Sequence, residues 1–575
     1  MKILDIDLSS YDYSIEEKED LKKWLGGSGL ATQLMKEKME DKECDPLEKE
    51  NVIVFASGPF NSAYPVASKC VAMFKSPLTG NLGESHAGGR VGTSISNAGH
   101  DALVLRGKSD NPIYIVVDND EVYFRDASAI WGIGNSLIVG RILAEREKKR
   151  GRRAVLRIGG AGEKMVSYAD VTAETFRHFG RLGLGAVFGS KKLKGLVIIG
   201  DRSEEVGEAK KYRKMYDEIY ERAVESDAMD KYHLLGTAVN VASLDEIGAL
   251  PTKNLQRTSS DSVSELSGEN LAESIGRRVA CNHCPIACIH IANLREPYRN
   301  QPYFYKTYMI SYDYELIYAL GSMLDLRSKE DFLRMIHKVE IHGLDAMSTG
   351  VSLAWATEAL EKGLISTEET LEPLEFGERG PYLKAVDHLI GRPNEFYEHL
   401  GKGVEHASDV YGGKGFALAF GGNEMPGYHT GPAAIIGRSI AQRHSHLDNA
   451  GYSTDQKIEE IPPPEELVDQ LVEEEQWRQV LSSLVVCYFA RGVYDDDLIV
   501  RALEPLGIKI KEKELRDLGE EIYFEKLGLK KELGFDMDDL RIPERVYETE
   551  SARGPVNEEY VQKALDHFKS VMEGQ

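Results

Sequence analysis

Four cysteines impose the tightest constraint on how this chain can fold. Cys281, Cys284 and Cys288 follow a C-x2-C-x3-C spacing, and Cys487 comes about two hundred residues later. Three close thiolates and one distant thiolate match the four soft, negatively charged ligands of a cuboidal iron–sulfur cluster. To bind one cluster, the fold must bring two remote segments to one pocket wall. The spacing therefore predicts an iron–sulfur protein that transfers electrons.

Two other interpretations of these cysteines stay open from the sequence. A four-cysteine zinc site usually consists of two C-x2-C pairs, whereas this chain has one such pair followed by a third cysteine. The thiols can also be ordinary core residues, as we expect for Cys44 and Cys70, which stand alone near the N-terminus. Disulfides are not expected in a chain of this length without a signal peptide.

Composition is typical of a globular protein with several domains. The chain has 575 residues, of which 42% are hydrophobic and 29% charged, and it lacks an apolar run of membrane-spanning length. Its first residues alternate like a strand and lack the basic and apolar regions of a signal peptide, so we expect a cytoplasmic protein. A net charge of −24 argues against nucleic acid as a partner, because phosphate binding needs a basic face.

Two basic runs are local exceptions to this acidity. They are Lys148–Arg153 and Lys191–Lys194. Such runs are usually solvated turns, and the sharper hypothesis is that they dock an acidic electron carrier.

The pattern of residues predicts an α+β fold with three parts. Residues 1–203 are rich in glycine and in β-branched strand-like segments such as Ile113–Val117, whereas the chain from about 205 onward is mostly helical. Glycine and proline breaks predict a further boundary near 412. We therefore expect a β-rich domain over 1–203 and two mostly helical domains over 204–411 and 412–575.

Glycine clusters in the first part allow the backbone to approach another group closely. Any single cluster is typical of a tight turn between strands. None matches a P-loop or a strand–GxGxxG–helix fingerprint. Several clusters in one β-rich domain, with basic residues nearby, predict a large anionic cofactor laid across a sheet.

Taken together, these motifs resemble the aldehyde:ferredoxin oxidoreductases, which are tungsten bis-pyranopterin enzymes, over essentially the whole chain. The resemblance implies that the β-rich domain is a base for two pterins and that the two helical domains cover them. The motifs are Gly26–Leu30, Ser57–Pro59, Lys75–Gly80, Gly88–Gly89, Gly99–Ala102, Leu184–Lys191, Cys284–Cys288, Tyr314–Glu315 and Gly343–Gly350.

The resemblance implies two pterin-holding motifs. The first, ending in Gly-Leu-Asp, supplies Glu340 and Asp345, with Glu in place of the usual Asp. Carboxylates suit this task because a pterin edge presents N–H donors in a dry pocket. The second motif keeps Cys487 but has Ser482 where the family has Asp. We expect Ser482 to accept one hydrogen bond from a pterin that is otherwise held by backbone groups.

The phosphate end of the pterins also departs from the family pattern. Lys69 stands where the family often has Arg, His86 stands where it often has Asn, and Arg177 with His178 occupies an Arg-Ala position. Each residue keeps a hydrogen-bond donor, so phosphate or a bridging Mg²⁺ can still be held, although lysine lacks the bidentate grip of arginine. Ordinary loop polarity is the alternative for Lys69 and His86.

The resemblance places Glu315 beside the metal and His446 near the substrate. Oxidation of an aldehyde to an acid adds one oxygen from water and removes two electrons and two protons. It needs a base for water or the hydrate, a donor to the carbonyl oxygen, and an electron acceptor. We assign Glu315 as the base, His446 as the donor, and the tungsten as the acceptor, while the sequence leaves molybdenum open. Without the resemblance, Glu315 is interpreted as a solvent-facing helix residue and His446 as an ordinary loop histidine.

One departure concerns assembly. Some family members bridge two subunits by a metal on a Glu-x2-His step, which here reads Arg334-Met335-Ile336-His337. Arginine does not ligate a cation, so we do not expect a metal-bridged homodimer. Electrons from the [4Fe–4S] cluster are expected to pass to ferredoxin or to a small iron–sulfur subunit. Two alternatives remain: reductive or non-aldehyde chemistry, and a non-catalytic electron-transfer subunit.

Overall fold

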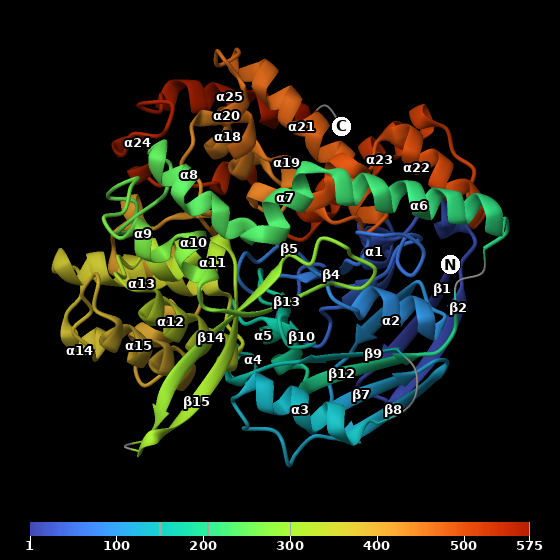
Figure 1. Cartoon of the computed structure of the whole chain (residues 1–575), viewed down its shortest axis with the longest axis horizontal. Coiled ribbons are helices and arrows are strands. Elements are labelled where there is room, and N and C mark those ends of the chain that lie inside the picture. The colour runs from blue at the N-terminus through green and yellow to red at the C-terminus, as the bar shows by residue number, and fades with distance from the viewer. Residues whose placement is uncertain (149–151, 204–205, 300, 574–575) are drawn as a thin grey trace. The chain divides into compact units, whose positions relative to one another are not determined.

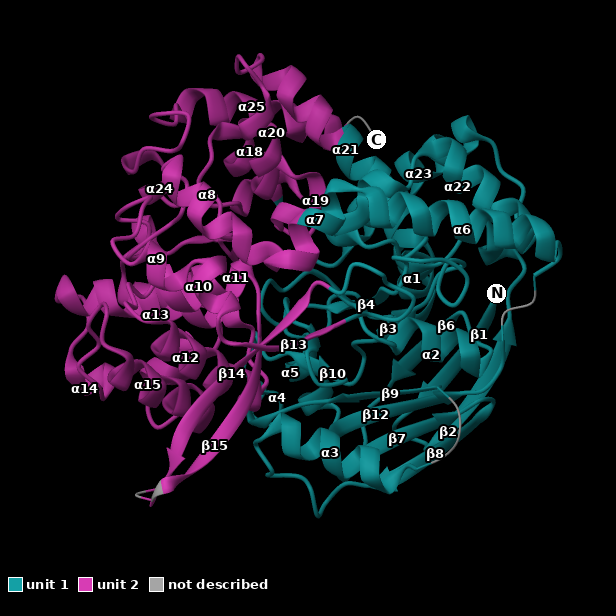
Figure 2. Ribbon diagram, in the orientation of Figure 1, with its two compact units in different colours: residues 1–230, 280–287, 473–536 teal, residues 231–279, 288–472, 537–575 magenta. Residues whose placement is uncertain are grey.

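The computed structural model describes residues 1–575 except 149–151, 204–205, 300 and 574–575. The chain divides into two compact units whose segments interleave along the sequence (Figure 2). Unit 1 contains residues 1–230, 280–287 and 473–536, and unit 2 contains residues 231–279, 288–472 and 537–575. The α+β class is confirmed, with two mixed six-stranded sheets in the N-terminal part and mostly helices after it (Figure 1).

The first sheet of unit 1 has the strand order β2-β1-β6-β3-β4-β5. Parallel pairing joins β1 to β6, and the other neighbours are antiparallel. Its strands are β1 (Lys2–Asp7), β2 (Asp12–Glu17), β3 (Ile53–Ala56), β4 (Cys70–Lys75), β5 (Leu82–Ala87) and β6 (Ala102–Arg106). Strands β3 and β4 are completely buried, as their apolar, β-branched sequences predict, whereas β2 lies at the edge and is mostly exposed.

The second sheet has the order β11-β10-β9-β12-β7-β8, in which β7 and β12 are parallel. One apolar core contains side chains of both sheets, including Phe55 and Leu103 from the first and Val117 and Leu196 from the second. The strands are β7 (Ile113–Asp118), β8 (Glu121–Asp126), β9 (Arg152–Arg157), β10 (Val171–Ala173), β11 (Arg177–Phe179) and β12 (Leu193–Gly200).

Helices complete both units. The longer ones of unit 1 are α1 (Gly27–Lys38), α2 (Val91–Ala98), α3 (Ser136–Arg146), α6 (Ala209–Glu225), α22 (Asp496–Leu503) and α23 (Glu512–Glu532). Those of unit 2 include α12 (Lys329–His342), α13 (Ala346–Glu361), α15 (Arg379–Gly391), α17 (Val404–Tyr411), α18 (Pro432–Ile440) and α25 (Glu558–Glu573). Helix α21 (Pro464–Ser483) contributes residues to both units. Among the described helices, none is both long enough and apolar enough to cross a bilayer.

A three-stranded sheet interrupts the part of the chain that we expected to be mostly helical. Its strands are β13 (Ile275–Val279), β14 (Ile289–Tyr298) and β15 (Gln301–Tyr312), paired antiparallel in that order. The aromatic and β-branched residues of β15 favour a strand, but they do not alternate regularly with polar residues, and the strand was not predicted. The division into three domains stays a prediction.

The basic run Lys191–Lys194 is not a solvated turn, so that interpretation was wrong. Lys191 and Lys194 are completely buried. The Lys191 ammonium donates to the backbone carbonyls of Gly107 (2.8 Å) and Lys49 (3.1 Å), and Lys194 forms an ion pair with Glu163. Burial lowers the pKa of Lys191 to about 7. Buried lysines do not dock a carrier; the run Lys148–Arg153 lies partly outside the described residues.

Candidate functional site

The cysteine motif is the loop that connects β13 to β14. Within unit 1, this loop is tied to the β-rich domain by backbone hydrogen bonds. The Asn282 N–H donates to the Gly89 carbonyl (3.0 Å), and the Val66 N–H donates to the His283 carbonyl (3.3 Å). The Val66 carbonyl in turn accepts from the N–H of Cys487 (2.9 Å). One residue of the β-rich domain therefore contacts both the cysteine loop and the remote cysteine segment.

None of the six cysteines, all of which the structure describes, is in a disulfide, and Cys44 and Cys70 are buried, as predicted. Cys281, Cys284, Cys288 and Cys487 are partly exposed. Within the described ranges, no three His, Cys, Asp or Glu side chains converge as a closed metal site. Ligation of a cluster by these four cysteines therefore stays a prediction.

Two observations fit a cluster beside this loop. A Cβ at Gly88 would lie 2.8 Å from the Cys281 sulfur. Any residue other than glycine at position 88 would therefore push this thiol away. His283 has a buried Nε2 atom for which the described residues provide no hydrogen-bond partner. Burial, helped by Arg152, lowers the pKa of His283, so the ring is neutral and can donate one N–H.

Gly88 also brings together two residues predicted for the phosphate end. The same Cβ position lies 3.7 Å from the Lys69 ammonium and 3.7 Å from Cδ of Arg177. The Lys69 N–H donates to the Val485 carbonyl (3.2 Å), and Arg177 Nε donates to the Phe176 carbonyl (2.6 Å). Two cations therefore lie close to Cys281, which fits an anionic group at this place.

Gly88→Ala is expected to lower the bound iron by about half or more, because the new methyl group displaces the Cys281 sulfur and such overpacking costs about 1–3 kcal/mol. The helix content should stay unchanged. Iron analysis and circular dichroism of the purified variant measure the two effects. Gly380→Ala is the matched control, since its Cβ position meets nothing within 4 Å. Full iron content in Gly88→Ala would count against a cluster at Cys281.

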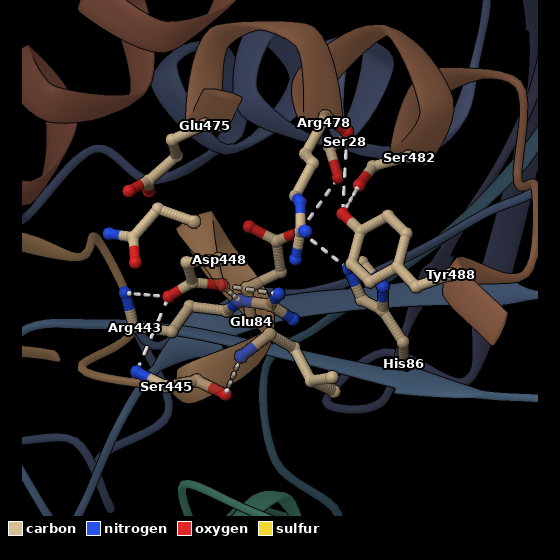
Figure 3. Close-up of polar contacts among 12 residues, drawn as sticks. Ser28, Glu84, His86, Arg443, Ser445, Asp448, Glu475, Arg478, Ser482 and Tyr488 are labelled. Carbon is tan, nitrogen blue, oxygen red and sulfur yellow. Dashed lines mark hydrogen bonds and ion pairs between the residues drawn. The ribbon is translucent and has the colours of Figure 1, made fainter. Parts of the chain in front are cut away.

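His86 lies in a buried polar network on β5 (Figure 3). Its Nε2 atom lies 2.6 Å from Oε1 of Glu84, and Ser28 Oγ donates to the same oxygen (2.7 Å). The other oxygen of Glu84 forms an ion pair with Lys526 (2.6 Å), and both partners are at most 2% exposed. Glu84 and Lys526 were not predicted from the sequence, although the spacing of Glu84 and His86 puts them on one face of the strand.

Lys526→Met is expected to lower the free energy of unfolding by about 3–5 kcal/mol, because Glu84 is left as a buried charge without its counter-ion. Glu84→Gln/Lys526→Met is expected to recover most of this loss, since the double change removes both charges. Urea denaturation of the two variants measures the difference. An unchanged unfolding midpoint for Lys526→Met would show that Glu84 is neutral in the folded protein.

Ser482 is in the last turn of helix α21 and lies beside the glycine-rich N-terminus of α1. Its hydroxyl contacts the Tyr488 hydroxyl, which also donates to the Arg478 carbonyl (3.3 Å) (Figure 3). A Cβ at Gly27 would fall 2.0 Å from the Ser482 carbonyl oxygen, and Gly27 has a φ of +40°. The glycine motif therefore serves close packing of α1 on the Ser482 segment. The side chain of Ser482 is committed to Tyr488, so its predicted contact with a pterin stays a prediction.

His178 belongs to β11, where it pairs with Thr172. Burial lowers its pKa to about 3, with help from the charges of Arg177 and Arg157. The imidazole is therefore neutral at ordinary pH. His178 can offer a hydrogen bond to a phosphate but no positive charge.

In unit 2, the Gly-Leu-Asp motif joins two helices. Gly343 ends α12 in the left-handed conformation (φ 72°), and Asp345 caps α13 by accepting from the N–H groups of Met347 (3.1 Å) and Ser348 (3.2 Å). Glu340 is buried in the last turn of α12. Both carboxylates are thus interior, but Asp345 already has a structural task.

Glu315 and His446, predicted as catalytic residues, contact each other in unit 2. The distance from His446 Nε2 to Glu315 Oε1 is 3.1 Å, and the side chains are 11% and 17% exposed. The other oxygen of Glu315 accepts from the Gly427 N–H (3.1 Å). Glu315 lies in the short helix α11 (Tyr314–Ile317), directly before a π-helical turn at Tyr318–Ser322, a geometry frequent at functional sites.

Local capping fixes the position of His446. Ser445 and Asp448 form a capping box at the start of α19 (His446–Asn449), of which His446 is the first residue. Arg443 holds Asp448 through Nε (2.6 Å) and Nη2 (2.5 Å) (Figure 3). The imidazole is therefore attached to a rigid helix start rather than to a free loop.

Three tyrosines surround this pair, and two of them, Tyr428 and Tyr452, were not predicted from the sequence. Tyr428 stacks on Tyr452 (ring centroids 4.1 Å apart) and lies 5.0 Å from the rings of both His446 and Tyr314. Burial, and then the charge of Glu315, raise the pKa of Tyr314 and Tyr428 well above the usual range. These hydroxyls stay protonated, so the site has an apolar, aromatic wall with O–H donors.

Arg334 and His337, at the step where we expect no bridging metal, are engaged within unit 2. Arg334 forms an ion pair with Glu296 of β14 (2.5 Å), and the His337 ring lies 4.2 Å from the Tyr308 ring of β15. Strands β14 and β15 therefore lie against this part of α12.

Comparison with known proteins first assigns the chain to a class of oxidoreductases. A family model described as the N-terminal domain of aldehyde ferredoxin oxidoreductase matches residues 3–200, and one described as domains 2 and 3 of that enzyme matches residues 214–573. The chain therefore belongs to the aldehyde ferredoxin oxidoreductase family.

Individual relatives differ in what they act on. The chain is 30% identical to a tungsten-containing aldehyde ferredoxin oxidoreductase of Thermococcus kodakarensis, over 96% of this chain and 92% of the relative. It is 29% identical to the WOR-like subunit of an aliphatic sulfonate oxidoreductase of Pyrococcus furiosus, over 71% and 66%. The active-site complex BamBC of benzoyl coenzyme A reductase shares the fold, with a TM-score of 0.84 at 19% identity, over 99% of this chain and 94% of that chain.

Proposed function

We propose that this protein is a tungsten–pterin oxidoreductase that oxidises aldehydes to carboxylic acids. The observation that carries the proposal is the Glu315–His446 pair, 3.1 Å apart and set against a wall of tyrosines. Family membership supports a bis-pyranopterin and a [4Fe–4S] cluster as the cofactors. The bound metal centre would supply the two-electron acceptor.

The residues of the chain supply proton transfer and orientation. Glu315 is placed to take a proton from water or from the aldehyde hydrate, and the Gly427 N–H holds the carboxylate in place. His446 donates to the carbonyl oxygen, and the tyrosine wall keeps bulk water away from it. In balance, the aldehyde and one water give the acid, two protons and two electrons.

Other residues would hold the cofactors. Lys69 and Arg177, with His86 and neutral His178, offer donors to pterin phosphates or to a bridging Mg²⁺, and Glu340 and Asp345 offer acceptors to a pterin edge. Ser482 would contribute one acceptor. Cys281, Cys284, Cys288 and Cys487 would bind the cluster, from which electrons leave to ferredoxin or to a small iron–sulfur subunit.

Elemental analysis combined with a viologen-coupled assay tests the proposal. We expect tungsten together with about four irons per chain, and viologen reduction with aldehydes as donors. Reduction of carboxylic acids or aromatic thioesters without aldehyde oxidation would reject aldehyde oxidation as the function. Iron without tungsten or molybdenum would instead indicate a non-catalytic electron-transfer subunit.

A further inference from the structure

The sheet β13–β15 carries the cysteine loop at one end. The loop leaves β13 at Val279 and enters β14 at Ile289, so Cys281 and Cys288 lie within two residues of a strand end. From that end, β14 and β15 continue as a long hairpin that extends beyond α12 and α15 (Figure 1). A protein bound along this sheet would therefore reach the residues that flank the proposed cluster.

One face of the hairpin packs against α12, although Phe304 and Lys306 near its tip are exposed. Because residues directly opposite each other in antiparallel strands share a face, Glu296 lies with Lys306, and Leu294 lies with Tyr308. This is the face that α12 covers through Arg334 and His337.

The opposite face, which we call the open face, presents aromatic and basic side chains to solvent. By register, Arg295 lies beside Thr307 and Pro297 lies beside Tyr305. Tyr303, Tyr305 and Met309 are 88%, 52% and 48% exposed. The exposed members of the open face are Arg277, Asn293, Arg295, Pro297, Tyr303, Tyr305, Thr307 and Met309, whereas Ile291 and Ser311, on the same face next to the cysteine loop, are buried.

Charge indicates what fits this face. From Ile275 to Tyr312 the chain has five Arg or Lys residues and a single acid, Glu296, which Arg334 already pairs, whereas the whole chain has a net charge of −24. Arg277 and Arg295 are exposed on the open face, and Arg295 stacks on the Tyr305 ring at 4.8 Å. Aromatic residues and arginine are the types enriched at protein interfaces.

We propose that the open face docks an acidic electron-carrier protein that exchanges electrons through the cysteine loop. This inference deepens the proposed function and depends on the electron-transfer role of the cluster. Two arginines attract the acidic partner and orient it, while Tyr305 and Met309 supply the apolar contact. The carrier takes no part in the proton transfers assigned to Glu315 and His446. Substrate oxidation therefore proceeds without the carrier when a small molecule accepts the electrons.

Binding of an oxidised, acidic ferredoxin to the holoprotein tests the proposal without turnover. Calorimetry should give a dissociation constant that rises with ionic strength. Arg277→Glu/Arg295→Glu should raise it by about tenfold or more at low salt, and Tyr305→Ser/Met309→Ser should raise it to a similar extent. Benzyl viologen reduction should stay within about twofold of wild type, because a small dye needs no docking face.

Lys511→Glu/Lys513→Glu, at two exposed side chains at the start of α23, is the matched double charge reversal and should leave binding unchanged. Equal weakening by this control, or unaltered binding by both open-face variants, would overturn the proposal. Native mass spectrometry showing a homodimer that the open-face variants dissociate would also overturn it, in favour of a second copy. Salt-sensitive ferredoxin binding with no aldehyde oxidation would reject the proposed function and keep the docking face.

Discussion

Cys284→Ala is expected to remove most of the iron from the protein and to reduce viologen-coupled turnover by more than about a hundredfold. A cuboidal cluster needs four thiolates, and the other three cannot close its coordination. The loop itself should persist, because Asn282 and His283 hold it through backbone atoms that the substitution leaves intact. Iron analysis and the visible absorbance of the cluster measure the loss.

Cys44→Ala is the matched control for this experiment. Cys44 is also a free cysteine, but it is buried outside the cysteine loop. We expect full iron content and a stability loss of about 1 kcal/mol from the small cavity. Equal iron in both variants would show that Cys284 is not a ligand, and zinc in place of iron in the wild type would restore the zinc interpretation of the motif.

Glu315→Gln is expected to lower kcat by about 10²- to 10⁴-fold with little change in KM, because the amide keeps the shape of the side chain but cannot accept a proton. The amide has a single oxygen, so it can keep either the contact with His446 or the hydrogen bond from the Gly427 N–H, but not both. Iron and tungsten content should equal those of the wild type. Steady-state kinetics with aldehyde and viologen, together with metal analysis, measure the outcome.

Glu330→Gln is the matched control: it also replaces a carboxylate by an amide, but at an exposed position of α12, and it should leave kcat unchanged. His446→Gln should lower kcat less than Glu315→Gln does, since the glutamine NH2 group can donate to the carbonyl oxygen in place of the imidazole. A Glu315→Gln variant with full kcat would remove Glu315 as the base. A variant that loses its metals would make Glu315 a residue needed for cofactor retention instead.

Much of the fold could be predicted because its signals are local. The apolar, β-branched runs in β3, β4, β7 and β12 predicted these strands, and helical periodicity predicted α6. The sheet β13–β15 was not predicted because one face of its strands is exposed and carries polar and aromatic residues. These sequences therefore lack the apolar run that is typical of a buried strand. The buried state of Lys191 was missed for a related reason: lysine is normally a surface residue, and its partners are backbone carbonyls, which leave no trace in sequence.

The candidate site was predictable only through family resemblance. Glu315 and His446 lie 131 residues apart in the sequence, and no local pattern joins them. The structure brings their side chains to 3.1 Å. Glu84 and Lys526 escaped notice because a buried ion pair between remote segments has no spacing rule. Tyr452 was missed because an aromatic residue in a helix is usually a core residue.

Val66 gives the β-rich domain an unusual intolerance to changes in length. It has a left-handed backbone (φ 54°) and hydrogen-bonds to both the cysteine loop and Cys487, and three residues later Lys69 bonds to Val485. Connecting loops ordinarily accept insertions. Here one extra residue between Val66 and Lys69 would break either the hydrogen bonds of Val66 or the hydrogen bond from Lys69 to Val485. The length of this segment is therefore fixed by its hydrogen bonds.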